Sequence, residues 1–176
     1  MKKMMLSALA MASMVLTGAV MADDDYRGRR GVDVKPVTNA LYKSECASCH
    51  MAFQPGFLPA RSWKKLMGGL ADHFGDNAEL AEGDRQAIEE YLVANAADTA
   101  SERRARKFMN SVGDTTPLRI TEVRYFIAKH NEVPKRMLTH EKIGSLSNCM
   151  ACHTRADAGS YAEREIRIPG VGRWED

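Results

Sequence analysis

The sequence of 176 residues predicts a mainly α-helical protein with few or no strands, divided into two small domains. Several segments place apolar residues at the i, i+3, i+4, i+7 spacing of one helix face. Stretches containing proline and glycine separate these segments, as expected of loops between helices. One pattern, C-x-x-C-H, occurs once in each half. We therefore predict an N-terminal domain over residues 37–98 and a C-terminal domain over residues 99–176.

The repeated pattern stands at residues 46–50 (CASCH) and 149–153 (CMACH). C-x-x-C-H is the signature for covalent attachment of a c-type haem, whose vinyl groups bind the two thiols. The adjacent histidine ligates the iron from the attached face. All four cysteines of the chain belong to these motifs, so the sequence predicts two covalently bound haem c groups. The predicted attachment and proximal-ligand residues are Cys46, Cys49 and His50 for the first haem and Cys149, Cys152 and His153 for the second.

Two other kinds of site also use C-x-x-C pairs. Two pairs can form a four-cysteine zinc site, and a single pair can act as a redox dithiol. Neither of these sites needs a histidine directly after the second cysteine. With 5 histidines in the chain, chance rarely places one at both positions. The haem interpretation is therefore favoured over both.

The N-terminus predicts export. Lys2 and Lys3 precede an apolar, uncharged segment over residues 4–21, and Ala22 provides a small residue at a cleavage site. A transmembrane anchor is the alternative, but the segment is only weakly hydrophobic. We expect residues 1–22 to be a cleaved signal peptide, residues 23–36 to be a flexible leader, and the protein to reside in the periplasm. Cleavage leaves equal numbers of basic and acidic residues, so charge indicates no nucleic-acid partner.

The first half predicts three helices around its motif. They are expected over residues 37–50, 62–74 and 82–97, with Ser62 capping the second, and a loop over residues 54–59. This order is typical of a small class I cytochrome c domain. In the second helix the apolar positions are Trp63, Leu66, Met67 and Leu70, and the same stripe reaches His73 three residues later.

The second half predicts a basic helix over residues 103–112, ended by Gly113, and a helix over residues 121–131 capped by Thr121. The apolar stripe of the latter is Val123, Phe126, Ile127 and then His130. The tail over residues 166–172 is expected to be extended and to close over the second haem. Because His73 follows its motif and His130 precedes its own, the halves do not form a tandem repeat.

Each iron needs a second axial ligand on the face opposite the motif. A histidine on an apolar helix face is usually a core residue, but a buried haem nearby favours ligation. We expect His73 to complete the first site and His130 the second, with His140, which stands among polar neighbours and is expected to be exposed, as the alternative for the second. The methionines that compete for these positions are Met67, Met109 and Met137, of which Met67 shares the face of His73.

Two histidine ligands on each iron predict an electron carrier. They give low-spin, six-coordinate haems, and imidazole in place of methionine lowers the reduction potential. A saturated iron has no position for oxygen, peroxide or substrate, so we expect the protein not to be an enzyme. The alternative is a dihaem enzyme, of the peroxidase or sulfur-oxidising type, in which one haem can open.

These motifs together resemble the bacterial dihaem cytochrome c family, over essentially all of residues 38–174. The resemblance implies two domains with bis-histidine haems, the first of class I type, His73 and His130 as distal ligands, and low-potential electron transfer in the periplasm. It also implies a small oxygen-binding monohaem cytochrome (the sphaeroides haem protein) as acceptor, often with a membrane cytochrome b as donor. Tyr125 departs from the tryptophan common in the family. The runs that carry the resemblance are residues 42–50, 55–63, 66–67, 73–75, 125–126, 147–153 and 168–170.

Overall fold

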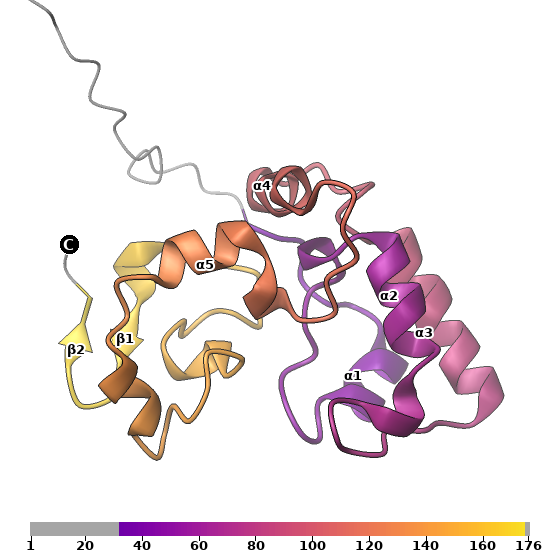
Figure 1. The fold of residues 1–176 in the computed structure, drawn as a ribbon, viewed down its shortest axis with the longest axis horizontal. Coiled ribbons are helices and arrows are strands. Elements are labelled where there is room, and N and C mark those ends of the chain that lie inside the picture. The colour runs from indigo at the N-terminus through magenta and orange to yellow at the C-terminus, as the bar shows by residue number, and fades with distance from the viewer. Residues whose placement is uncertain (1–31, 175–176) are drawn as a thin grey trace, which may run out of the picture.

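The computed structural model describes residues 32–174, and these residues form a mainly helical protein, as predicted (Figure 1). The expected signal peptide, over residues 1–22, lies outside the described residues. None of the helices in the described part is long and apolar enough to cross a membrane. The helices are α1 (Ala40–Cys46), α2 (Ala60–Met67), α3 (Glu82–Ala94), α4 (Arg103–Val112) and α5 (Arg124–His130).

The rest of the described chain consists of short elements and loops. One small antiparallel sheet pairs β1 (Arg167–Ile168) with β2 (Gly172–Arg173). The tail expected to be extended over residues 166–172 therefore folds back on itself through a turn at residues 169–171. Single turns of 3-10 helix connect the larger elements. They are η2 (Pro55–Phe57), η3 (Leu70–Asp72), η4 (Ile120–Glu122), η5 (Lys135–Thr139), η6 (Cys149–Ala151) and η7 (Glu163–Glu165).

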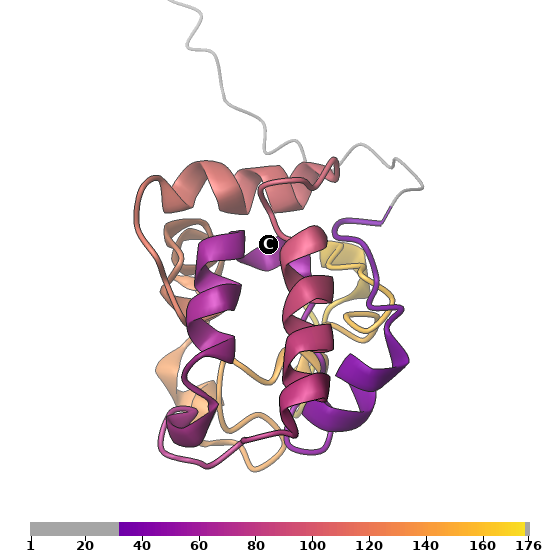
Figure 2. The same cartoon turned by 90° about the vertical axis from the view of Figure 1, so that its right-hand side faces the viewer.

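Helices α2 and α3 of the first half run side by side, and α4, the first helix of the second half, lies across one end of them (Figure 2). Trp63 and Leu66 of α2 and Ile88 and Leu92 of α3 are buried where these two helices pack. The indole Nε1 of Trp63 donates a hydrogen bond to the carbonyl of Pro55 at 2.8 Å. That bond ties the loop after the first motif to α2, as a buried indole N–H requires.

The helix expected over residues 62–74 is wrong at both ends. Helix α2 begins at Ala60, with Pro59 at its cap position, and Ser62 is buried inside it. It ends at Met67 because Gly68 and Gly69 follow, and glycine has low helix propensity. The stripe therefore does not continue into His73, which lies after the separate turn η3.

The observed ends of α1 and α5 also differ from the predicted ones, whereas those of α4 agree. Helix α1 covers only 40–46 of the expected 37–50, capped by Asn39, whose Oδ1 accepts a hydrogen bond from the amide of Tyr42 at 2.8 Å. Helix α4 matches its predicted bounds and ends at Gly113, whose φ of 56° lies in the left-handed region that favours glycine. Thr121 does not cap α5, which begins at Arg124. Ile127, placed on the apolar stripe, is 52% exposed.

The two halves share one hydrophobic core. Phe57 of the first half packs against Phe108 of α4, with ring centroids 4.9 Å apart, and against Tyr161 at 5.2 Å. A flexible leader does not describe residues 32–36. The amides of Asp33 and Val34 donate to the carbonyl of Gly159 at 2.9 and 3.2 Å, and Val34 is fully buried. This segment straps the start of the first half onto the second half.

Candidate haem sites

The first site pairs His50 with His73. Their ring centroids are 6.2 Å apart and their planes differ by 27°. His50 comes from the turn that follows α1, where its Nδ1 donates to the carbonyl of Met51 at 2.7 Å. The ring of Phe53 also stacks on the His50 ring, with centroids 4.8 Å apart. The hydrogen bond and the stacking ring together fix the orientation of this imidazole.

His73 is held in a tight turn rather than on an α-helix. Its amide donates to the carbonyl of Asp76 at 2.7 Å, and the amide of Gly75 donates to the Asp72 carboxylate at 2.9 Å. Phe74 has a φ of 62°, the left-handed region that a bulky residue rarely adopts. The guanidinium of Arg119, from the second half, lies 3.8 Å from the centroid of the Phe74 ring. The second half therefore also supports the first site.

The second site pairs His130 with His153, with ring centroids 6.1 Å apart and planes at 71°. His130 ends α5, and its Nδ1 donates to the carbonyl of Phe126, one turn earlier, at 2.8 Å. The Phe126 ring stacks on the His130 ring with centroids 3.9 Å apart. Tyr161 lies beside His153 at 5.2 Å. The end of a helix thus supplies one imidazole, and the motif that begins with η6 supplies the other.

The separation of the rings fits an iron between each pair. A metal–imidazole bond is about 2 Å long and a ring centroid lies about 1 Å behind its nitrogen, so a shared metal puts the centroids about 6 Å apart. At the second site a cavity of about 360 Å³ lies between the paired rings and apolar side chains of α4, α5 and the tail. In the described part of the chain, the buried Nδ1 of His153 has no hydrogen-bond partner. These features suit a large apolar group with a metal at its centre.

Burial lowers the pKa of three of these imidazoles, which favours the neutral ring that binds a metal. Burial lowers the pKa of His153 to about 4, with smaller contributions from His130 and Arg104. Burial also lowers the pKa of His130. For His73, burial and then the neighbouring His50 lower the pKa. In each case the shift favours the form of the ring that has a lone pair free for a metal.

The thiols do not fit the alternatives to haem. Burial raises the pKa of Cys46 and of Cys149 to about 11, whereas a redox dithiol needs a lowered pKa. Across residues 32–174 no three cysteine, histidine or acidic side chains gather around a common point, so the two pairs do not form one zinc site. Cys49 is exposed, whereas Cys46 is half-buried. One edge of the first motif therefore faces solvent.

The other residues considered as axial iron ligands do not face a motif histidine as His73 and His130 do. His140 is half-buried rather than exposed as expected, because its ring lies against Gly170, and its Nδ1 accepts a hydrogen bond from the amide of Lys142 at 3.2 Å. Met67, the last residue of α2, is buried in the hydrophobic core. Met137 lines the second cavity, but His130 is the residue that faces His153 there.

Three residues at the sites escaped the sequence analysis. Arg104 and Tyr161 line the second cavity, and Arg119 supports the turn of His73. Arg104 brings positive charge to the cavity wall, which suits the acidic propionates of a haem. The basic composition of α4 was visible in the sequence, but only tertiary packing distinguishes Arg104 from its exposed neighbours. No local signal marks Tyr161.

Two C-x-x-C-H motifs, each facing a second histidine in a mainly helical fold, define this protein as a c-type cytochrome with two haem sites. The chain belongs to the dihaem cytochrome c family, whose model (DHC) matches residues 42–161. It therefore carries two covalently bound haem c groups, as predicted, and serves electron transport.

Solved structures of this family are similar over most of the chain. A dihaem cytochrome c from Rhodobacter sphaeroides is 49% identical, with a TM-score of 0.64, and the match covers 73% of this chain and 100% of that one. A new dihaem cytochrome c from Shewanella baltica OS155 is 41% identical, with a TM-score of 0.65, and the match covers 78% of this chain and 98% of that one. No curated protein matches the chain.

Proposed function

We propose that this protein is a periplasmic carrier that passes electrons at low potential through two bis-histidine haems. The observation that carries the proposal is the pair of histidine separations, 6.2 Å for His50 and His73 and 6.1 Å for His130 and His153. Both irons are then six-coordinate and low-spin, and neither has a free position for a substrate. The haem supplies the redox chemistry, and two nitrogen ligands keep its potential below that of a methionine-ligated haem.

The residues around each pair favour reversible electron transfer over ligand exchange. His50 and His130 each donate an Nδ1 proton to a backbone carbonyl, which fixes the ring and raises its basicity as a ligand. An arrangement that changes little between the two oxidation states needs little reorganisation, and this is what an electron carrier requires.

The ligand assignment is tested by three histidine variants of the haem-loaded protein. H73A should open the first haem alone and H130A the second alone, each adding a high-spin charge-transfer band to the ferric spectrum and CO binding to the ferrous protein. H140A is the control and should leave both haems low-spin. A wild-type protein that binds CO readily at one haem would instead support the dihaem enzyme alternative. An H73A variant with two low-spin haems would refute the assignment of His73.

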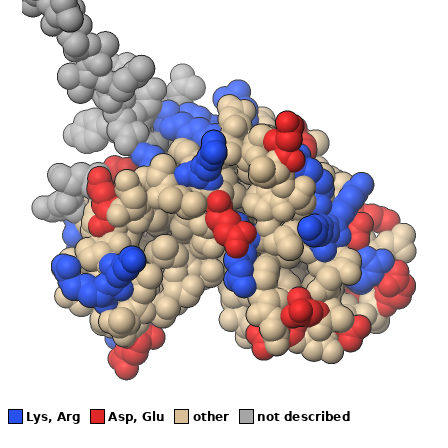
Figure 3. All heavy atoms as spheres, in the orientation of Figure 1, with Lys and Arg blue, Asp and Glu red and all other residues tan. Residues whose placement is uncertain are grey.

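The proposed acceptor is a small oxygen-binding monohaem cytochrome, and the proposed donor is a membrane cytochrome b. The exposed Cys49 supports docking of a partner near the first haem, because electrons exchange fastest over short distances. Basic and acidic side chains are interspersed over the face drawn in Figure 3, so steering by a single large patch is not expected there. Stopped-flow mixing of the reduced protein with such a cytochrome tests the partner. N-terminal sequencing of the exported protein tests cleavage after Ala22 and should read Asp23 first.

A further inference from the structure

One buried polar side chain connects the two halves of the molecule. Gln54 is fully buried, and both ends of its amide form hydrogen bonds across the core. Its Nε2 donates to the carbonyl of Ala156 at 2.5 Å, and its Oε1 accepts from the hydroxyl of Tyr161 at 2.7 Å. A buried amide is costly unless it is paired, and an apolar residue would fill the same space without that requirement. Packing alone therefore does not explain a hydrogen-bonded glutamine and tyrosine at this position in the core.

Each end of this hydrogen-bonded pair leads to a proximal histidine. On one side Gln54 is bonded in the chain to Phe53, whose ring stacks on His50 with centroids 4.8 Å apart. On the other side the Tyr161 ring lies 5.2 Å from the ring of His153. A continuous series of contacts thus joins the two motif histidines, with one hydrogen bond and two ring contacts in addition to covalent bonds.

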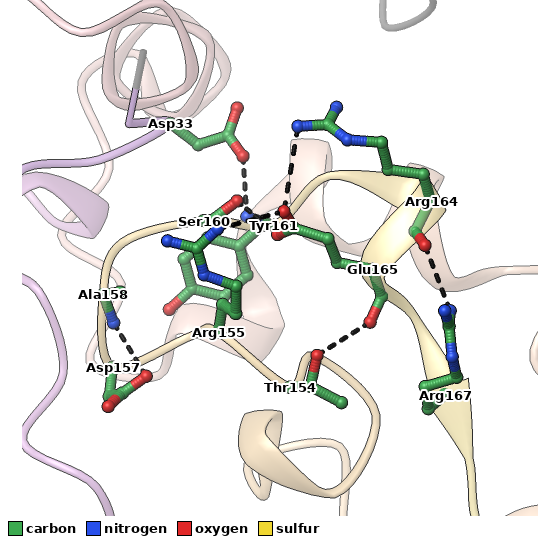
Figure 4. Close-up of polar contacts among 10 residues, drawn as sticks. All are labelled: Asp33, Thr154, Arg155, Asp157, Ala158, Ser160, Tyr161, Arg164, Glu165 and Arg167. Atoms are coloured by element: carbon green, nitrogen blue, oxygen red, sulfur yellow. Dashed lines mark hydrogen bonds and ion pairs between the residues drawn. The ribbon is translucent and has the colours of Figure 1, made fainter. Parts of the chain in front are cut away.

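Tyr161 is fixed in place from several directions. Its amide donates to the Asp33 carboxylate at 2.6 Å, and its ring packs edge-on against Phe57 at 5.2 Å. The flanking loop is tied by Glu165, whose carboxylate accepts from the Ser160 hydroxyl at 2.6 Å (Figure 4). These contacts restrict the movement of the Tyr161 ring relative to its neighbours. Steady contact distances matter because electronic coupling falls steeply with any gap.

We propose that Gln54 and Tyr161 form the electronic link between the two haems. One electron leaves a ferrous haem and arrives at the ferric haem of the other half, so that one iron is oxidised and the other reduced. No bond forms or breaks, and Tyr161 keeps its proton and is never itself oxidised. The hydrogen bond between Gln54 and Tyr161 strengthens this electronic coupling, because electrons tunnel more readily through bonded and hydrogen-bonded atoms than across an unbonded gap. This inference rests on the proposed function of passing electrons through both haems.

The test uses the haem-loaded full chain and the variants Y161F, Q54L and the double variant. Y91F is the control, since Tyr91 is a tyrosine of the first half whose hydroxyl accepts a hydrogen bond from the amide of Thr38 at 3.2 Å rather than from Gln54 or Tyr161. In half-reduced protein, the linewidths of the haem methyl NMR signals report the rate of electron exchange between the haems. Potentiometric titration of each variant gives the driving force separately.

The proposal predicts that Y161F and Q54L each slow the exchange several-fold, whereas Y91F keeps the wild-type rate. The double variant should be no slower than the slower single variant, because both changes break the same link. Equal linewidths in all variants, or rates that follow only the measured potentials, would overturn it. The ferric spectrum separates this failure from failure of the proposed function: low-spin haems with unchanged exchange reject only the link, whereas a high-spin wild type rejects the carrier.

Discussion

Gly159 is the position at which a single added methyl group should displace the segment of residues 32–36 from the second half. Its φ is 74°, a left-handed conformation that costs a residue with a side chain about 1–2 kcal/mol. A Cβ atom built there would also overlap the carbonyl oxygen of Val34. That oxygen belongs to the strap whose two amides donate to the Gly159 carbonyl. The backbone of residue 34 has to move if Gly159 is replaced.

The cost of Gly159→Ala follows from these contacts. Losing the two hydrogen bonds from Asp33 and Val34 costs about 0.5–1.5 kcal/mol each. With the conformational cost, the free energy of unfolding should fall by about 2–5 kcal/mol, before any exposure of the buried Val34 is counted. Gly144→Ala is the matched control, because Gly144 has a φ of 64° but nothing lies near its Cβ position. It should lose only the conformational part, about 1–2 kcal/mol.

The two variants are compared by guanidinium unfolding of the haem-loaded protein, followed by circular dichroism in the far ultraviolet. Because the haems are bound covalently, unfolding does not remove them. A loss for Gly159→Ala that does not exceed the loss for Gly144→Ala would refute the close approach of the strap. A larger loss accompanied by normal spectra would show that the strap stabilises the fold without setting the haem ligands.

Three further outcomes follow. Phe126→Ala should lose about 3–5 kcal/mol of stability, because it empties a buried aromatic position, whereas Ile127→Ala should change stability by less than about 0.5 kcal/mol; the same unfolding curves measure both. Burial raises the pKa of Tyr42 and Tyr161, so the unfolded chain loses these protons first and stability should fall as pH rises above about 10, by up to about 1.4 kcal/mol per pH unit for each tyrosine. The variant Y42F should make that slope smaller in unfolding measured from pH 9 to 11. Replacing both cysteines of the first motif with alanine should leave one covalent haem per chain, which mass spectrometry of the intact protein counts.

The sequence predicted best what depends on local chemistry. Helix α4 has its predicted bounds because Gly113 ends it with a backbone angle that few other residues adopt easily. The C-x-x-C-H motifs predicted the haems because the spacing itself defines the attachment chemistry. The ends of α2 were wrong because Ser62 was taken as a cap, and because the apolar stripe continued past two glycines that end the helix.

The rest of the site depends on packing between distant segments. His73 was expected on a helix face, but it faces His50 from a turn after η3, so the residue was placed on the wrong element. Gln54 and Tyr161 are separated by 107 positions in the chain, and nothing near either residue indicates their contact. Residues 32–36 were expected to belong to a flexible leader over residues 23–36, which as a whole is charged and contains glycine. The hydrogen bonds from Asp33 and Val34 to Gly159 are a tertiary interaction that this composition does not predict.

The two sites have nearly the same histidine separation, but the distal histidine lies at a helix end in the second site and in a short turn in the first. His130 stands at the end of a helix, stacked on Phe126 and hydrogen-bonded to its carbonyl. His73 stands in a turn next to Phe74, whose backbone is strained and whose ring is 43% exposed under Arg119. Displacing His73 disturbs a small, partly exposed turn, whereas displacing His130 disturbs a packed helix. If one haem opens on warming, it should therefore be the first, and the low-spin signal lost should be the one that H73A removes.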